Sequence, residues 1–346
     1  MRILIARNDR LGDLVLSTPV ISSIRASYKN AYIGVLVNKY AKDVIRYNNE
    51  IDTIIIDEDM ESGKLRGFSN IVKVIKREHF DIALILHPTF TVCALAFFSG
   101  IKRRISHGSK WYVYLFCNEV LKQNRSRVPH HEADFNLELA GVIGGMNNVI
   151  RRTKILFPES SIKRTREFLA ERSINGNDAF AIMHCGSGGS ARNWAAGNYA
   201  ELADLLIREL SLKLLLTGTQ VDKKMVTDVQ SAMKEKPVEA LNIGSVSDYA
   251  ALISNARVFV GPSTGPLHFA VAMNIPVAGI YSPVFVQSAT RWGPYSAEKS
   301  FVICPDVVCP AIYRCIYEKC KFYDCMALIR PYDVFKKVSA LLVGSL

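Results

Sequence analysis

Residues 258–273, which read Val-Phe-Val-Gly-Pro-Ser-Thr-Gly-Pro-Leu-His-Phe-Ala-Val-Ala-Met, decide the fold. The three apolar residues at the start predict the end of a buried strand, and the Gly-Pro pair after them stops it. Ser263 or Thr264 is then placed to cap a helix that continues to Met273. A strand that enters a helix through a short Gly/Ser/Thr turn directs backbone N–H groups and the positive end of the helix dipole at one point. Phosphate groups bind at such points.

This stretch is equally compatible with a packed corner that binds nothing, because short Gly/Ser/Thr motifs recur by chance. Two further polar loops favour a binding site. Residues 184–194 are rich in glycine and serine and end in Arg192 beside Trp194. Residues 217–222 offer Asp222, a carboxylate suited to a ribose diol. Three polar loops at the ends of neighbouring strands are harder to attribute to chance than one.

Apolar segments alternate with helical patterns along both halves of the chain. The apolar segments of the first half are residues 2–6, 31–37, 53–56 and 81–87, and the helical patterns between them are residues 19–28, 40–47 and 68–77. The apolar segments of the second half are residues 180–183, 212–216, 240–243, 258–260 and 277–281. This alternation predicts an α/β protein with doubly wound parallel sheets.

A chain of 346 residues is too long for one ordinary core and has room for two domains of about 150 residues each. A change of pattern over residues 147–177 indicates the junction. We expect a first domain over residues 1–158, a second over 159–330, and a helix over 331–346 that packs back on the first domain. Two such domains are expected to face a central cleft that holds a substrate from both sides.

The charge balance indicates an anionic partner. The net charge is +11 and the isoelectric point is about 9.2, which favours nucleic acid, an acidic membrane surface or a phosphorylated substrate. Basic residues concentrate between positions 102 and 131, although part of this run is expected to be only a solvated surface. No apolar run approaches the roughly 18 residues that span a bilayer, and the charged start does not resemble a signal peptide. We therefore expect a cytosolic protein.

Gly12 and Asp13 follow the first apolar segment, at the carboxyl end of a strand, where open α/β sheets bind their ligands. The segment lacks the Gly-x-Gly-x-x-Gly pattern, so a dinucleotide cofactor is not indicated. Neither half has Asp or His residues at metal-binding spacing. We therefore expect no cofactor and no metal.

Three motifs carry a family resemblance: Gly12-Asp13 near the start, Arg192-Asn193-Trp194 in the middle, and Ser-Thr-Gly-Pro-Leu-His at residues 263–268. Further support comes from residues 80–85 with His87, from residues 275–277 and from residues 291–295. In order and spacing this set resembles glycosyltransferase family 9, over nearly the whole chain. The best-known members of that family are the ADP-heptose:lipopolysaccharide heptosyltransferases.

The resemblance implies a GT-B fold of two Rossmann-like domains, the first binding mainly the acceptor and the second the nucleotide-sugar. Asp13 matches the family's proposed catalytic base. Arg192 stands where a lysine commonly provides a cation for the diphosphate, and Asp222 where a glutamate often contacts the ribose. Many members have Asp where this chain has Ser263. The expected donor-binding residues are Ser187, Arg192, Asp222, Ser263, Thr264, Gly265 and His268, and the expected acceptor-binding residues are Arg10, Lys64, Arg66, Arg103 and Arg104.

The implied function is inverting transfer of a heptose or related sugar from an ADP-sugar to an inner-core lipopolysaccharide acceptor or another anionic glycan. The basic surface would hold the enzyme at the anionic inner face of the inner membrane. Three alternatives remain: a transferase for another nucleotide-sugar or acceptor, an isomerase that needs no acceptor, and a basic nucleic-acid-binding protein. No aromatic-basic interleaving or helix-turn-helix supports the last, so we expect no nucleic-acid partner.

Five of the eight cysteines lie in one short span, at Cys304, Cys309, Cys315, Cys320 and Cys325. Their spacings differ from the Cys-x-x-Cys pairs of zinc sites, and an odd number cannot all form disulfides. In a reducing cytosol most are expected to be thiols packed in the interior. A metal site or a disulfide is the alternative.

Overall fold

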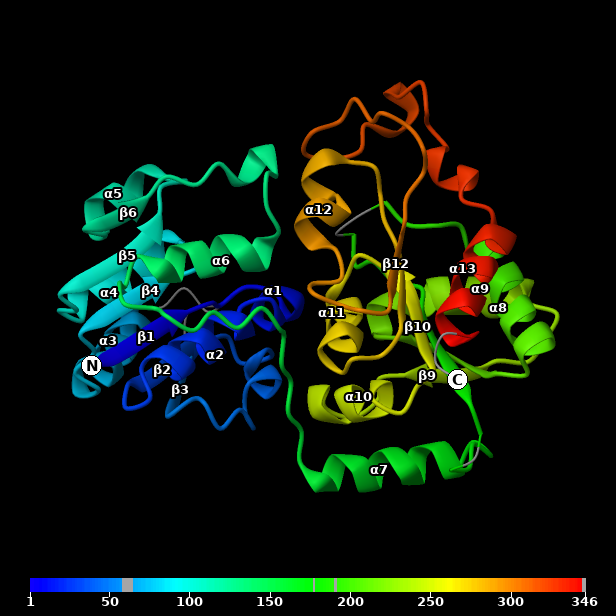
Figure 1. Ribbon diagram of the computed structural model, residues 1–346, viewed down its shortest axis with the longest axis horizontal. Helices are drawn as coiled ribbons and strands as arrows, with labels where there is room; N and C mark the ends of the chain where they lie inside the picture. Colours follow the sequence, from blue (N-terminus) through cyan, green and yellow to red (C-terminus); the bar gives the residue numbers. More distant parts are fainter. Residues whose placement is uncertain (58–64, 177, 190–191, 344–346) are drawn as a thin grey trace. The chain divides into compact units, whose positions relative to one another are not determined.

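The computed structural model describes residues 1–57, 65–176, 178–189 and 192–343. It divides into two compact units, Met1–Leu156 and Phe157–Leu346. The division falls at Leu156, whereas the sequence placed it after residue 158. Each unit is built around its own parallel sheet of six strands (Figure 1). The predicted α/β class with doubly wound parallel sheets is therefore confirmed.

The first sheet has the strand order β3-β2-β1-β4-β5-β6. Its strands are β1 (Arg2–Ala6), β2 (Tyr32–Val37), β3 (Thr53–Ile56), β4 (Ile82–Ile85), β5 (Arg103–His107) and β6 (Glu119–Leu121). The central strands consist almost wholly of buried Ile, Leu, Val and Ala, as a sheet covered on both faces requires. The helices are α1 (Leu11–Val15), α2 (Thr18–Ser27), α3 (Leu65–Arg77), α4 (Phe90–Phe98), α5 (Trp111–Phe116) and α6 (Glu132–Gly141). Helix α2 packs with α6, while α4 packs with α3 and α5.

One predicted helix of this unit is wrong. Residues 40–47 contain only the 3-10 helix Lys42–Val44. Asn38 Oδ1 accepts the backbone N–H of Ala41, and Asn48 Oδ1 accepts that of Glu50. These side chains offer the backbone local partners that compete with a helix, so the segment turns at both ends.

The second sheet has the order β12-β11-β10-β7-β8-β9. Its strands are β7 (Phe180–His184), β8 (Lys213–Gly218), β9 (Val238–Leu241), β10 (Val258–Pro262), β11 (Val277–Ile280) and β12 (Ser300–Ile303). The helices are α7 (Glu159–Ala170), α8 (Ala196–Leu210), α9 (Lys223–Ala232), α10 (Val246–Ile253), α11 (Gly265–Ala272), α12 (Ala289–Trp292) and α13 (Pro331–Val343). In this unit α10 packs with α7 and α11, and α8 packs with α9 and α13 (Figure 1).

The C-terminal helix α13 belongs to the second unit. It packs against α8 and against β10, β11 and β12, and its buried Val334 and Val338 join the apolar core of that unit. The apolar face of α13 is therefore covered by the second sheet, and the expectation that this segment also packs back on the first domain stays a prediction.

The stretch 258–273 folds as the sequence predicts. Strand β10 ends at Pro262 and α11 begins at Gly265, with Thr264 in an extended conformation between them (φ −141°, ψ 171°). Within the described residues, no helix is both long enough and apolar enough to cross a membrane.

The strand order fixes where each unit can bind a ligand. In each sheet the first strand lies in the middle, and the chain builds outward from it first to one side and then to the other. Parallel sheets of this order bind ligands at the carboxyl ends of the two strands where the direction reverses. These strands are β1 and β4 in the first unit and β7 and β10 in the second.

Candidate active site

A buried guanidinium lies at the reversal point of the first unit. Arg7 follows β1 and is 3% exposed. Its Nε donates to Asp9 Oδ1 at 2.7 Å and its Nη2 to Asp13 Oδ1 at 2.6 Å. Glu132 Oε1, from α6, lies 3.4 Å from Nη1. Burial alone would lower the pKa of Arg7, but the three carboxylates raise it well above its ordinary value.

Asp13 is a carboxylate of this cluster whose pKa is raised toward neutrality. It lies in the first turn of α1. Burial raises its pKa from 3.8 to about 6; the charge of Arg7 lowers it, and the charges of Asp9 and Glu132 raise it further. A carboxylate with a pKa near neutrality can hold a proton that it has removed from a substrate, as a general base must.

Two histidines complete this site. His87 follows β4, and its Nδ1 lies 3.1 Å from Asp9 Oδ2. Burial would raise the pKa of Asp9, but Arg7 and the hydrogen bond from His87 together lower it. His107, at the end of β5, is buried, which lowers its pKa to about 3, so it is neutral. Asp9 therefore stays charged beside Asp13.

The sequence analysis did not identify Arg7, Asp9 or Glu132 as site residues. Arg7 and Asp9 lie directly after the first apolar segment. That position, at the end of a predicted strand, is a sequence signal that identifies them as candidate site residues. Glu132 is 125 residues from Arg7, and no local pattern indicates that they meet.

The expected acceptor-binding residues have different environments. Arg10 is exposed and precedes α1. Arg66 lies in the first turn of α3, and Lys64 is outside the described residues. Arg103 donates to both carboxylate oxygens of Glu119, at 2.7 and 2.8 Å.

Arg103 and Arg104 both make hydrogen bonds that connect β5 to the neighbouring segments of the chain. Arg103 also donates to the backbone oxygens of Val142 and Ile143. Arg104 Nε donates to the oxygen of Phe116 at 2.6 Å, and its guanidinium lies over the ring of Phe97. These contacts occupy most of the guanidinium N–H groups of Arg103 and Arg104, the two residues that the sequence analysis expected to bind the sugar acceptor.

In the second unit, the three polar loops follow β7, β8 and β10, and β7 is hydrogen-bonded to both of the others. The prediction that they follow neighbouring strands is therefore confirmed. His184 Nδ1 lies 3.2 Å from Thr217 Oγ1, which lies 2.9 Å from the Tyr249 hydroxyl. Burial lowers the pKa of His184 to about 4, so the imidazole is neutral and links the strand ends.

Asp222 holds two of these loops in place. Its Oδ2 accepts the backbone N–H and the hydroxyl of Thr219, at 3.0 and 2.9 Å. A Cβ at Gly186 would overlap its carboxylate, so Gly186 allows the loop after β7 to pack directly on Asp222. The side chain expected to contact a ribose therefore shapes both loops. Ser187, the next residue of the first loop, is half-buried.

The turn before α11 presents a helix N-terminus. Thr264 Oγ1 donates to the Pro262 oxygen at 3.3 Å, and the Thr264 side chain does not cap the helix. Gly265 begins the helix and His268 is buried in its first turns. Ser263 is hydrogen-bonded to the hydroxyl of buried Tyr281. A helix N-terminus of this kind directs backbone N–H groups and the positive end of the helix dipole at the turn, which suits an anionic group.

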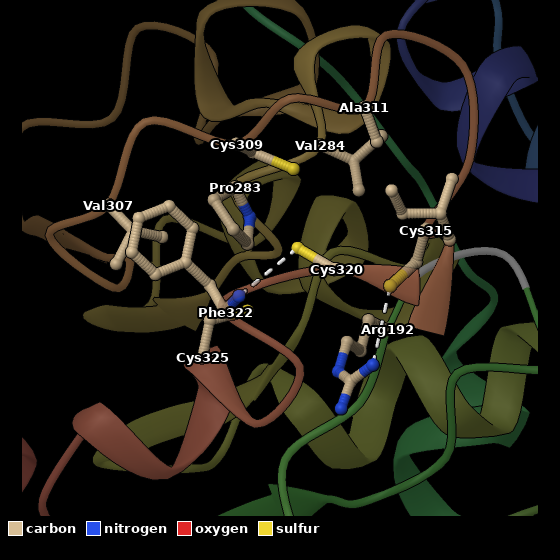
Figure 2. A pocket seen from close by; sticks show the side chains of 11 residues that line it. Arg192, Pro283, Val284, Val307, Cys309, Ala311, Cys315, Cys320, Phe322 and Cys325 are labelled. Atoms are coloured by element: carbon tan, nitrogen blue, oxygen red, sulfur yellow. Dashed lines mark hydrogen bonds between the residues drawn. The ribbon is translucent and has the colours of Figure 1, made fainter. Parts of the chain in front are cut away.

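Arg192 lies in a pocket formed with the segment that follows β12 (Figure 2). Its Nη1 donates to Cys315 Sγ at 3.3 Å, and its Nη2 lies 3.9 Å from Asp324 Oδ1. The guanidinium also lies about 5 Å from the rings of Tyr317 and Tyr323. The expected diphosphate cation is therefore held by the cysteine-rich segment.

Comparison with known proteins identifies the family. The family model described as glycosyltransferase family 9 (heptosyltransferase) matches residues 69–314. The chain belongs to this family. A protein of Haemophilus influenzae, provisionally named a glycosyltransferase, is 31% identical over 317 residues, which are 88% of this chain and 89% of that protein. The chain described here is therefore a glycosyltransferase, as its resemblance to family 9 implied.

Solved structures confirm the GT-B fold of this family 9 member. A family 9 glycosyltransferase of Veillonella parvula superposes with a TM-score of 0.87 at 22% identity, covering 99% of this chain and 97% of its own. The ADP-heptose lipopolysaccharide heptosyltransferase II of Escherichia coli superposes with a TM-score of 0.81 at 20% identity, covering 100% of this chain and 99% of its own.

Proposed function

We propose that this family 9 enzyme moves a heptose or a related sugar from an ADP-sugar to an inner-core lipopolysaccharide acceptor, with inversion at the anomeric carbon. The observation that carries the proposal is Asp13, a carboxylate with a pKa near 6 at the reversal point of the first unit. The donor and the acceptor follow from the family and from the named function of the E. coli relative.

In the proposed reaction, the acceptor hydroxyl attacks the anomeric carbon while Asp13 removes its proton. Arg7 holds Asp13 Oδ1, so Oδ2 is the oxygen that takes the proton. The bond between the anomeric carbon and the diphosphate breaks, and ADP leaves with the bonding electrons. The deprotonated form of Asp13 is the active one, and a pKa near 6 keeps it deprotonated at neutral pH.

The departing diphosphate gains negative charge and needs hydrogen-bond donors. We propose that the N-terminus of α11, with Thr264 and Gly265, and the loop containing Ser187 supply backbone N–H groups for it. Arg192 is the proposed cation of this site. Its side chain is 12% exposed, and reorientation of its guanidinium from Cys315 toward a phosphate would be part of donor binding. Ser263, in place of the Asp of many relatives, leaves the donor-binding turn without that carboxylate.

We further propose that an aromatic patch on α4 and α5 holds the enzyme on the anionic inner face of the inner membrane. The patch comprises Phe90, Phe97, Phe98, Trp111, Tyr114 and Leu115, which are all exposed. Trp111 is 70% exposed and Phe98 53%. Aromatic side chains of this kind insert at the level of lipid headgroups.

Lysines flank the aromatic patch. Lys102 follows α4 and Lys110 precedes α5, and both are exposed. Each lysine near an anionic membrane contributes about 1 kcal/mol of binding free energy. This pairing of aromatic rings with lysines is typical of a peripheral membrane surface. Lys102 and Lys110 belong to the basic run that the sequence analysis assigned in part to membrane binding.

The decisive experiment offers the purified enzyme a set of nucleotide-sugars, with and without a deacylated inner-core oligosaccharide. We expect ADP release and a new glycosidic bond only when ADP-heptose and the acceptor are both present. Consumption of the donor without an acceptor would identify an isomerase or a hydrolase. Transfer from a UDP-sugar but not from ADP-heptose would overturn the donor assignment.

A further inference from the structure

The segment between β12 and α13, residues 304–330, has little regular structure. It contains only two short 3-10 helices in the part that the structure describes, Tyr317–Lys319 and Cys325–Leu328. Loops of more than about 12–15 residues without regular structure are uncommon in compact domains. Met326 and Ile329 near its end join the apolar core of the unit, whereas Val308 and Tyr313 in its first half are strongly exposed.

The inward-facing side chains of this segment include four cysteines. Cys309, Cys315, Cys320 and Cys325 line the same pocket, with Arg192 at its side (Figure 2). The pocket has a volume of about 10 Å³, which is close to the room that one water molecule or one ion occupies. The fifth cysteine, Cys304, is exposed and does not line the pocket. All eight cysteines are free thiols, as expected, but only four of the eight are buried, and Cys325 is the one buried cysteine of this segment.

Two of the sulfurs accept backbone hydrogen bonds in the same local geometry. The N–H of Tyr317 donates to Cys315 Sγ, and the N–H of Phe322 donates to Cys320 Sγ, both at 3.4 Å and both from two residues further along. Arg192 adds a charged donor to Cys315 at 3.3 Å. Donors aimed at sulfur stabilise thiolates, and they form the outer contacts of metal–thiolate sites.

We propose that Cys309, Cys315, Cys320 and Cys325 bind one Zn²⁺ or iron ion as a tetrathiolate site, and that this ion organises residues 304–330. Thiolates are the soft ligands that select these metals. Binding forms four metal–sulfur bonds and releases one proton to solvent from each thiol. The resulting negative charge is offset in part by Arg192. This inference goes beyond the sugar transfer and does not depend on it.

The site closes by rotation of the cysteine side chains. Among the described residues, no three His, Cys, Asp or Glu side chains are already gathered at metal-binding distances. Metal–sulfur bonds measure about 2.3 Å. Rotation about χ1 from one staggered position to the next moves a cysteine sulfur by about 3 Å without moving the backbone. Side-chain rotation would therefore bring sulfurs that line one small pocket closer together, and the proposed site requires that metal binding draws the loop in to complete it.

The test measures metal content in the full-length protein, purified without chelator from cells supplied with zinc and iron. We expect about one metal ion per chain by elemental analysis, with zinc and iron distinguished directly. The double variant Cys315→Ser/Cys320→Ser should retain less than about a tenth of the wild-type metal content. Cys304→Ser is the matched control, because Cys304 belongs to the same segment but lies outside the pocket; it should bind metal as the wild type does.

A second measurement keeps the test valid if the double variant fails to fold. Wild-type protein stripped of metal should bind about one Co²⁺ per chain with an intense sulfur-to-cobalt absorption band, and the added metal should protect four thiols from a thiol-specific dye. Metal-free protein that binds no Co²⁺ and has eight reactive thiols after denaturation would overturn the proposal. Fewer than eight thiols without metal would do the same, in favour of disulfides.

Discussion

Arg7 Nη2 lies 2.6 Å from Asp13 Oδ1 in the first unit, yet burial raises the pKa of this paired carboxylate to about 6. The pair is therefore not a simple ion pair. Arg7 is shared with Asp9 and Glu132, so its charge only partly offsets the cost of burying Asp13. This balance gives the proposed base a pKa close to the pH at which it works.

The pH dependence of transfer should report this pKa. Because only deprotonated Asp13 can accept the acceptor proton, kcat/KM should fall about tenfold per unit below about pH 6 and stay level above it. Arg7→Met should move the midpoint upward, because the cation that lowers the pKa of Asp13 is lost. Arg7→Lys keeps the charge and is the control. A profile that is flat down to about pH 5 would contradict a base with this pKa.

The stability of Asp13→Asn should depend on pH in a defined way. The folded-state pKa of Asp13 is raised from 3.8 to about 6, so the folded protein binds this proton more tightly than the unfolded chain. The contribution of Asp13 to the free energy of unfolding therefore decreases as pH rises from about 4 to about 6. Asn cannot titrate, so Tm of the variant relative to wild type should increase over this range and then level off. A constant difference would show that burial does not perturb Asp13.

The aromatic patch should control membrane binding. Trp111→Ala with Phe98→Ala should weaken binding to vesicles that contain anionic lipid by about tenfold or more, since both rings are exposed on the surface proposed to insert. Val308→Ala is the control, because Val308 is 90% exposed but lies in the other unit. Sedimentation with vesicles measures the effect. Equal binding by the double variant and the wild type would show that the patch does not contact the bilayer.

Gly186→Ala should disturb the donor-binding loops. The added Cβ would overlap the Asp222 carboxylate, so one of the two loops must move, and Kd for ADP should rise about tenfold or more. Gly197→Ala is the matched control. Gly197 is the second residue of α8 and has open space around it, so alanine there should leave ADP affinity unchanged and should not destabilise the protein. Calorimetry that finds the same ADP affinity for both variants would argue against the loops as the nucleotide site.

Much of the fold follows from local sequence. The turn between β10 and α11 was predicted closely: the strand continues through Gly261 and Pro262 and ends there, and Pro266 favours the first turn of the helix that follows. The helix predicted over residues 40–47 does not form, because the side chains of Asn38 and Asn48 accept hydrogen bonds from the local backbone. Hydrophobic periodicity does not register such side-chain bonds.

The sites were less predictable because they depend on distant contacts. Asp13 was recognised from its place after β1, but its raised pKa depends first on burial in the folded unit and then on nearby charges, among them Glu132 far along the chain. The cysteine spacings argued against a metal site, yet the loop brings Cys309 and Cys325 to one pocket. Only the folded segment shows that these residues meet.

The central claim is tested most directly by single-turnover transfer from ADP-heptose to a deacylated inner-core acceptor, with wild type and Asp13→Asn compared at about pH 7.5. We predict that the variant loses transfer by about a hundredfold or more while its ADP affinity, measured by calorimetry, stays unchanged. Transfer by Asp13→Asn within a few-fold of wild type would contradict the assignment of Asp13 as the base.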